Sequence, residues 1–479
     1  MKKKFTLLSL LCCLSVASLA QQDAGKDQLI TSISKQEAAY AKVARKIWDY
    51  AEVGYQEEKS AALLQEELKK AGFTVKAGVA DMPTSFTATY GNGEPVIAIL
   101  AEYDALPGLS QADTPEQKAI TPGAAGHGCG HHLFGTGSVA AGIAVKDWLK
   151  SSGTKGTIRV YGTPAEEGGA GKVYMVRAGL FNDVDAVLHW HPSSANSASA
   201  SSSLANKSAK FRFYGAAAHA AASPEKGRSA LDGVEAMNNM VNMMREHIPS
   251  DTRIHYVITK GGEAPNVVPA FAEVYYYVRH PEMQTVKDIF DRVEKTARGA
   301  ALGTDTKMEY EVIHGIYNVL PNETLSKLMD NNLRLIGGVS YTEDEKAFAA
   351  KIQTTFTGNV PTVSEAAEIE PFKVELKGSG GSTDVGDVSW AVPTAGMTSA
   401  TWVPGTSAHS WQAVAAGGTS IGTKGMMVAA KTLALTAYDI FKNPAVVKEA
   451  SQELAQKRGN DFKYEALLGD RKPALDYRK

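Results

Sequence analysis

The chain has 479 residues, of which 44% are hydrophobic and 21% charged, and its formal net charge is −2. This length suits two or three domains better than one simple core. The ordinary globular composition excludes a chain that is disordered throughout, and the absence of a basic stripe argues against a nucleic-acid partner.

Residues 1–20 are predicted to be an export signal. Lysines at positions 2–4 precede an apolar stretch over 5–19 that is too short to span a bilayer, and small residues surround a cleavage point after Ala20. A buried N-terminal helix is the alternative interpretation. We therefore expect a periplasmic or secreted protein, and no other segment is apolar enough to predict a membrane span.

The predicted cleavage removes two of the three cysteines and leaves Cys129. A single cysteine forms no internal disulfide, and a free thiol is a liability in an oxidising compartment. Two interpretations of Cys129 stay open at this point. It is either a thiolate bound to metal or an inert buried thiol that packs as a small hydrophobic residue.

Residues 21–203 are predicted to form the first part of a catalytic α/β domain. Apolar spacing indicates helices within 35–71, and Gly72 is typical of a helix end. Short apolar runs predict buried strands at 95–100, 157–161, 186–188 and 398–403. Helical runs such as 133–149 and 424–441 lie between them, which favours an α/β sheet. The serine- and alanine-rich residues 193–203 are interpreted as a linker.

Residues 204–318 have a different pattern. Strand, helix, strand, strand, helix and strand follow one another between 209 and 316, which predicts a compact ferredoxin-like α+β domain. The α/β pattern returns over 319–479. The sequence therefore predicts a small domain inserted into a larger one.

Polar residues of metal-binding or catalytic type follow each predicted buried strand. Sites in open α/β sheets form at the carboxyl ends of the strands, so we expect these residues to meet at one edge. The residues are Glu102 and Asp104, Glu166 and Glu167, His189 and His191, and His409, joined by His127, Cys129, His131 and His132 before the helix at 133.

Coordination chemistry suggests roles for these side chains. Thiolate, imidazole and carboxylate together suit a divalent ion such as zinc or manganese. Glu166 and Glu167 are adjacent and point different ways on extended backbone, so one can bind metal while the other acts as general base for amide hydrolysis. His189 and His191 share a face, and the sequence does not choose between them.

Two further histidines have open roles. His132 is a metal ligand, a partner of a ligand, or a residue at the start of the helix, and the last two interpretations are favoured. His127 lies in a glycine-rich loop, where it either serves the site or only stabilises local structure.

Several motifs occur in an order that resembles a known family. They are AEYDALPG at 101–108, GHGCGHHL at 126–133, GTPAEEGG at 162–169, WHP at 190–192, GAAAHA at 215–220, GGEAPNVVP at 261–269 and GSTDVG at 381–386. Over residues 47–441 the chain resembles the aminoacylase/carboxypeptidase metallopeptidase family. Within it, the chain is similar to the amidohydrolase branch that includes hippurate and indole-acetyl-amino-acid hydrolases.

The resemblance implies a peptidase-like catalytic domain, with helices around a mixed, mostly parallel sheet, that binds two divalent ions, zinc or manganese. Cys129 would bridge the ions, where related peptidases use an aspartate. His131 and His191 would complete one ligand shell, and Glu167 and His409 the other. The family pattern, through the distance from Asp185, selects His191 over His189.

The remaining roles are implied in the same way. Glu166 would be the general base, and Asp104 would orient a ligand. The inserted domain would be a lid and dimerisation domain whose His219 reaches a partner subunit's site and stabilises the oxyanion. Asn266 would lie near the substrate, and Arg279 would bind a substrate carboxylate.

The implied activity is metal-dependent hydrolysis of the amide bond of an N-acyl amino acid, which releases an amino acid with a free carboxylate. A dipeptidase with the same site and a catalytically silent partner subunit are the alternatives. The resemblance also implies a homodimer or an assembly with a related subunit. The chain departs from this branch at His132, where Asp or Asn is usual, and in its export signal, since the relatives are mostly cytoplasmic.

Overall fold

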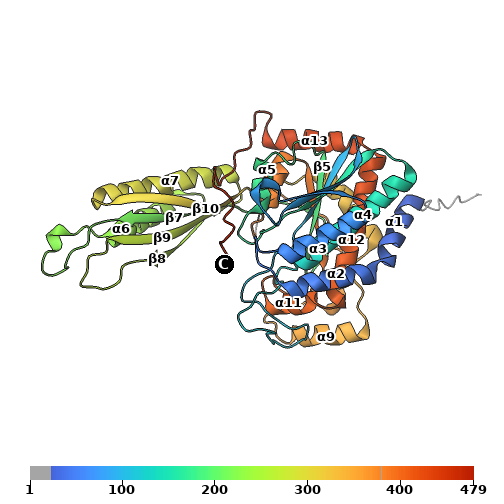
Figure 1. The fold of residues 1–479 in the computed structure, drawn as a ribbon, viewed down its shortest axis with the longest axis horizontal. Helices are drawn as coiled ribbons and strands as arrows, with labels where there is room; N and C mark the ends of the chain where they lie inside the picture. The colour runs from blue at the N-terminus through green and yellow to red at the C-terminus, as the bar shows by residue number, and fades with distance from the viewer. Residues whose placement is uncertain (1–22, 379, 479) are drawn as a thin grey trace, which may run out of the picture.

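A computed structural model describes residues 23–378 and 380–478, and Figure 1 shows two bodies, a broad α/β domain and an elongated domain that projects from it. The predicted export signal lies outside the described residues. Within the described residues, no helix has the length and apolarity needed to cross a membrane.

A six-stranded sheet forms the centre of the larger domain. Its order is β1 (Thr74–Ala77), β2 (Phe86–Asn92), β4 (Gly156–Gly162), β3 (Val96–Ala101), β5 (Ala186–Ser193) and β12 (Thr394–Ala400). Neighbours from β4 to β12 are parallel, and β1 and β2 add an antiparallel edge. Every residue of β3 is buried, as expected for a parallel strand covered on both faces. The prediction of a mixed, mostly parallel sheet is confirmed.

Helices α4 (His131–Ser152) and α12 (Ser420–Lys442) pack together against one face of this sheet, and Figure 1 shows α5 (Gly171–Arg177) and α13 (Ala445–Arg458) on the other side. Trp190 of β5 packs on α4, where its ring touches Phe134. The remaining helices of this domain are α1 (Ala24–Lys35), α2 (Glu37–Tyr50), α3 (Glu58–Lys70), α8 (Glu323–Ile336), α9 (Glu343–Gln353), α10 (Val385–Ala391) and α11 (Trp411–Gly417).

The projecting domain is an antiparallel sheet in the order β10 (Lys307–Ile316), β7 (Ala205–Tyr214), β9 (Phe271–His280), β8 (Arg253–Lys260). Helices α6 (Ala230–Met244) and α7 (Met283–Gly303) cover one face, over a core that includes Phe211 and Phe290. This strand-helix-strand-strand-helix-strand order is the predicted ferredoxin-like one. Short 3₁₀ helices occur at Val79–Asp81, Pro224–Lys226, Arg245–His247 and Val363–Ala367.

Two sequence predictions are wrong. The strand expected at 398–403 ends at Ala400 and begins earlier, at Thr394, because the whole of Thr394–Ala400 pairs with β5. Residues 193–203 are not a free linker. Within them β6 (Ala200–Ser201) pairs with β11 (Val374–Glu375), so this stretch is bonded to the domain.

Candidate metal centre and active site

Cys129 lies at the carboxyl edge of the central sheet, in a loop just before α4. Its two glycine neighbours allow close approach of other segments. A side chain at Gly128 would meet the backbone of His409 at 3.3 Å from its Cα, and the amide of His409 donates to the Gly128 carbonyl at 2.9 Å. Gly130 has φ +73° and lies under Pro192, which follows His191. The loop therefore brings Cys129 between two histidine-bearing segments.

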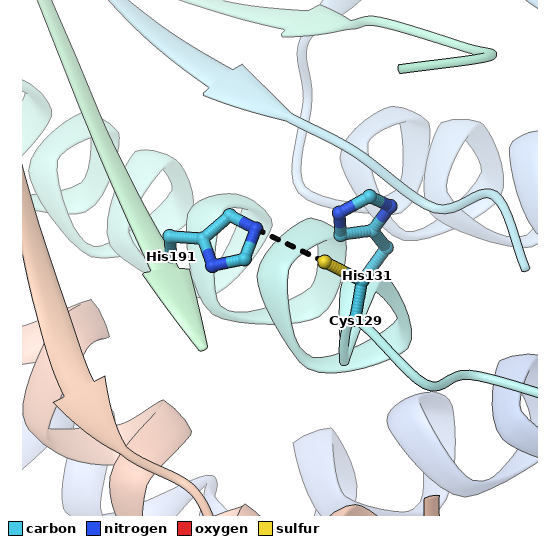
Figure 2. Close-up of side chains that lie close together, drawn as sticks. All are labelled: Cys129, His131 and His191. Atoms are coloured by element: carbon cyan, nitrogen blue, oxygen red, sulfur yellow. Dashed lines mark hydrogen bonds between the residues drawn. The ribbon is translucent and has the colours of Figure 1, made fainter. Parts of the chain in front are cut away.

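Cys129 belongs to two groups of possible metal ligands. Its Sγ lies 3.4 Å from His191 Nε2, with His131 beside them (Figure 2). The ligand atoms of Cys129, His131 and His191 lie within 4.8 Å of one another, and so do those of Cys129, Glu167 and His409. One thiol shared by two groups is the arrangement that a bridging ligand requires.

The structure distinguishes His191 from His189. Both rings project from the same face of β5, but it is His191 that reaches Cys129, while its Nδ1 bonds to the Pro192 carbonyl at 2.7 Å. His189 packs over Gly396 instead, where an added Cβ would lie 2.2 Å from its Nε2. The pairing of β5 with β12 thus keeps His189 away from the thiol.

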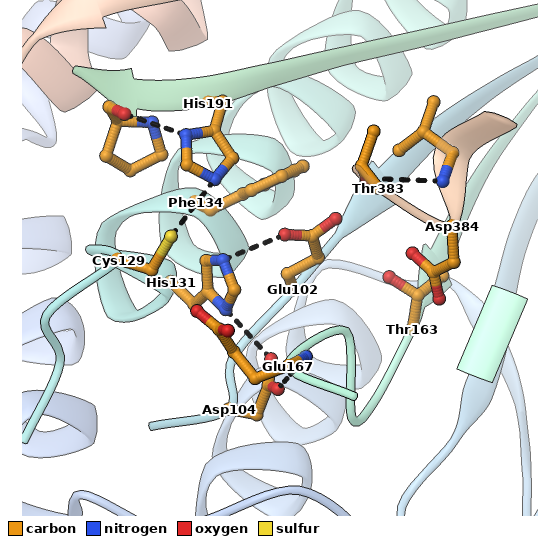
Figure 3. Close-up of polar contacts among 12 residues, drawn as sticks. Glu102, Asp104, Cys129, His131, Phe134, Thr163, Glu167, His191, Thr383 and Asp384 are labelled. Carbon is orange, nitrogen blue, oxygen red and sulfur yellow. Dashed lines mark hydrogen bonds and ion pairs between the residues drawn. The ribbon is translucent and has the colours of Figure 1, made fainter. Parts of the chain in front are cut away.

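Asp104 orients two of the predicted ligands (Figure 3). One carboxylate oxygen accepts a hydrogen bond from His131 Nδ1 at 2.8 Å, and the other accepts from the backbone amide of Glu167 at 2.9 Å. Because Nδ1 is used in this way, His131 Nε2 is the atom available for metal. That atom faces Glu102 Oε2 at 3.1 Å.

Glu166 and Glu167 point to different partners, as their adjacency predicted. Glu167 Oε1 lies 3.0 Å from His409 Nε2, whereas Glu166 groups with Glu102 and His131. Burial, followed by the nearby carboxylates of Glu102 and Glu167, raises the pKa of Glu166 well above its ordinary value. A carboxyl whose pKa is shifted towards neutrality suits a general base.

A fully buried lysine, Lys172, lies behind the metal ligands, and sequence reasoning missed it. Its Nζ lies 2.6 Å from Glu102 Oε1 and 2.6 Å from Asp384 Oδ1, and its backbone amide donates to Asp384. Burial alone would lower the pKa of Lys172, but the carboxylates of Asp384 and Glu102 outweigh it and hold the pKa above its usual value. A lysine at the start of a helix such as α5 resembles an ordinary surface residue, so nothing in the sequence marked it.

Glu57 is an unexpected buried carboxylate. It accepts hydrogen bonds from Thr84 Oγ1 at 2.9 Å and from the amide of Ala165 at 2.8 Å. Ala165 has φ +56°, a region that alanine rarely adopts. Glu57 therefore stabilises the strained turn that presents Glu166 and Glu167.

The two histidines with open roles anchor the loop to neighbouring helices. His132 Nε2 bonds to the Gly417 carbonyl at the end of α11, and His127 Nε2 bonds to the Ile47 carbonyl in α2, both at 3.0 Å. The groups of possible metal ligands include neither residue. Both interactions hold the Cys129 loop from outside the ligand set.

The predicted residues of the lid lie apart from this cluster. His219 and Asn266 are both exposed. Their segments lie side by side, because the amide of Ala220 donates to the Asn266 carbonyl and His219 forms an antiparallel β-bridge with Val267. Figure 1 shows the β7–α6 connection at the end of the lid that is farthest from the catalytic domain. Arg279 lies on β9, on the sheet face that the helices leave open, with its guanidinium 5.4 Å from the Tyr277 ring.

The residues present fit a metal centre. Glu102 Oε2, His131 Nε2 and Glu167 Oε1 are buried without a hydrogen-bond partner in the described part of the chain. His131 Nε2 and Glu102 Oε2 face each other at 3.1 Å, and Glu167 Oε1 faces His409 Nε2 at 3.0 Å, but neither contact has hydrogen-bond geometry. Buried polar atoms are otherwise almost always paired, and a cation bound between these atoms would pair them. The donor set of sulfur, imidazole and carboxylate is one that binds transition-metal ions and zinc.

Comparison with known proteins agrees with this geometry. Residues 98–416 match the model of the peptidase family M20/M25/M40. The chain is 46% identical over 442 residues to one of the subunits of the p-aminobenzoyl-glutamate hydrolase of Escherichia coli, covering 87% of this chain and 92% of that protein. It is 31% identical over 431 residues to the mouse Xaa-Arg dipeptidase, covering 87% and 88%.

Among solved structures, a dinuclear metal binding peptidase from Bacillus subtilis has the same fold, with a TM-score of 0.57 at 16% identity, covering 85% of this chain and 99% of that one. The fold and the site define a metal-dependent hydrolase that acts on amide bonds. The chain belongs to the peptidase family M20/M25/M40.

Proposed function

We propose that the protein hydrolyses the amide bond of an N-acyl amino acid of the p-aminobenzoyl-glutamate kind and releases an amino acid with a free carboxylate. The observation that carries the proposal is Cys129, shared by two ligand groups, with Glu166 beside them but outside both. The name of the E. coli relative supports the substrate class.

Glu166 is the proposed general base. Two divalent ions bound at the Cys129 groups would supply Lewis-acid polarisation of the scissile carbonyl. The Glu166 carboxylate would take a proton from the attacking water and return it to the leaving amine nitrogen. Its raised pKa makes the Glu166 carboxylate a stronger proton acceptor, which suits the first of these two transfers.

A cavity beside the candidate metal ligands is suited to bind an uncharged acyl group. It has a volume of about 250 Å³ and is bounded by His191, by serines 197, 199, 201 and 203, and by Thr383 and Thr398. Among the described residues that line it, none is Asp, Glu, Lys or Arg. A neutral cavity would leave a carboxylate unpaired, so the acyl half of the substrate fits here and the free carboxylate belongs elsewhere.

Arg279 is proposed to bind that carboxylate. Its guanidinium lies on the open face of the lid sheet beside Tyr277, and Arg offers a planar pair of donors that matches a carboxylate. Asn266 at the lid tip would contact the substrate from a neighbouring position. Closure of the lid over the metal centre would bring these groups to the substrate.

We propose a homodimer in which His219 completes the partner subunit's site. Strand β8 is one of the two edge strands of the lid sheet, and Val257 in it is 63% exposed, which suits pairing with a second copy. His219 Nδ1 accepts from the amides of Ala221 and Ala222 at 3.2 and 3.1 Å, which leaves the proton on Nε2. Nε2 would then donate to the developing oxyanion.

The metal is proposed to be zinc or manganese, and the protein is proposed to be exported, on the basis of residues 1–20. The chain resembles both subunits of the E. coli hydrolase. This also supports assembly with a related subunit. A partner subunit that is catalytically silent when alone is the alternative to the proposed activity.

Assays of the purified homomeric protein test the proposal. With zinc or manganese added, we expect hydrolysis of p-aminobenzoyl-glutamate or hippurate in preference to unblocked dipeptides. Arg279→Met should raise KM about 10-fold or more for these substrates, with little change in kcat, because it removes a carboxylate partner.

Two other outcomes would favour the alternatives. Faster turnover of dipeptides would favour the dipeptidase, for which the mouse relative is the supporting observation. No turnover of any substrate, with two ions bound, would favour the silent partner subunit.

A further inference from the structure

The segment 464–478, which follows α13, passes between the two domains and reaches the metal centre. In Figure 1 the dark red chain after α13 runs from the catalytic domain into the space beside the lid. It pairs with no strand of the sheets, so its position depends on side-chain contacts with both domains. Those contacts hold it at each end.

The first part of the segment is anchored at the root of the lid. Leu467 belongs to the hydrophobic core of the lid and packs on Gly315, where an added Cβ would lie 2.7 Å from the Leu467 Cβ. Arg471 donates to the Ile313 carbonyl and to Glu311 Oε1, both at 3.2 Å. These residues of β10 tie the segment to the lid.

The second part is anchored on the catalytic domain. Gln56 Nε2 donates to the Leu475 carbonyl at 2.8 Å, and Tyr174 OH donates to the Lys472 carbonyl at 3.2 Å. The Tyr477 ring meets the Tyr55 ring edge-on at 5.7 Å. Its hydroxyl fills the place that a side chain at Gly54 would take, since an added Cβ there would lie 2.2 Å from it.

The segment ends against the turn that carries the catalytic glutamates. Tyr477 OH donates to the Glu167 carbonyl at 3.0 Å, and Arg478 Nη2 donates to the same oxygen at 2.8 Å. On the other side of this residue, the Glu167 amide donates to Asp104. The backbone of Glu167 is thus fixed from both sides, and the guanidinium makes a charge-assisted bond.

This turn needs external support because its own backbone is strained. Ala165 has φ +56°, in the left-handed region that alanine rarely adopts. Conformations of this kind persist only where the surroundings impose them. If the peptide carbonyl of Glu167 were free to rotate, the side-chain carboxylate of the same residue would lose its fixed direction towards His409.

We propose that Tyr477 and Arg478 are positioning residues for Glu167. They hold the carbonyl of Glu167, which lies 310 and 311 positions before them in the sequence, and so direct its carboxylate towards Cys129 and His409. The proposal rests on the metal centre of the proposed function. It predicts weaker binding of the ion held by Glu167 and His409, and unchanged binding of the ion held by His131 and His191.

The test is the double variant Tyr477→Phe/Arg478→Met, with metal binding as the readout. We expect one of the two zinc ions to bind about 10–100-fold more weakly by calorimetry, and kcat to fall over the same range. The matched control is Tyr464→Phe, which removes the bond from Tyr464 OH to Asp387 in the same segment. This control should bind both ions as the wild type does.

Conservative variants keep the test decisive if the double variant does not fold. Arg478→Lys retains a charged donor and should restore most of the affinity that Arg478→Met loses. Two ions bound with wild-type affinity by the folded double variant, or equal affinity in the lysine and methionine variants, would overturn the proposal. The proposed function fails separately, if the wild type binds both ions and hydrolyses none of the amide substrates.

Discussion

The metal edge of the catalytic domain and the tip of the lid hold the residues proposed for one reaction in two different environments. At the metal edge, Cys129, His131 and Asp104 are buried and each has fixed partners. At the lid tip, His219 and Asn266 are exposed and held by local backbone bonds. A metal centre needs a rigid ligand set, whereas a residue that meets the substrate from another surface must stay accessible.

All the candidate metal ligands lie within one catalytic domain, whereas the histidine proposed to act in catalysis from the lid lies apart from them. Changes at the metal edge should therefore act on metal binding and folding. Changes at the lid tip should act on turnover alone. The following variants test this separation.

The largest effect is expected from Cys129→Ala. Removing the shared ligand should reduce bound zinc, measured by elemental analysis, from two ions per chain towards none, and should lower hydrolysis by at least about 10³-fold. Cys129→Asp is the matched control, since a carboxylate can also bridge two ions, and it should retain metal and part of the activity. Normal metal content in Cys129→Ala would contradict the site.

His219→Ala should lower kcat by about 10²–10³-fold, the usual effect of removing one oxyanion donor, and leave metal content unchanged. A mixture of His219→Ala and Cys129→Ala subunits should regain activity, because a heterodimer has one intact metal centre that meets an intact His219. His247→Ala, at an exposed histidine of the same domain, is the control and should have wild-type rates. If heterodimers form but stay inactive, His219 does not act across the interface.

Lys172→Met should destabilise the folded protein. The change leaves the Glu102 and Asp384 carboxylates buried without their cation, which should lower the free energy of unfolding by about 3–5 kcal/mol in denaturant titrations. Lys70→Met, at an exposed ion pair with Glu66, should have no measurable effect. Equal stability of the two variants would show that the buried cluster does not stabilise the fold.

Much of the site could be predicted because its motifs place chemically distinctive residues directly after apolar strands. Cys129, His131, Glu167 and His409 were expected at one edge, and the structure brings them there. Lys172 was missed because a lysine in a helix carries no signal of burial. The serine-rich stretch was misread as a linker, because polar composition does not reveal the pairing of β6 with β11.

The sequence by itself determined the family, the order of the two domains and the chemical types of the ligands, because these depend on local pattern and residue identity. Between His189 and His191, the local pattern made no choice and the family resemblance selected His191; the tertiary structure supplied the physical reason. His191 reaches Cys129 and His189 does not, because the register of β5 against β12 sets the surroundings of each ring. Only the tertiary structure showed that Tyr477 and Arg478 contact the Glu167 carbonyl. This contact joins distant segments and depends on how both domains pack around residues 464–478.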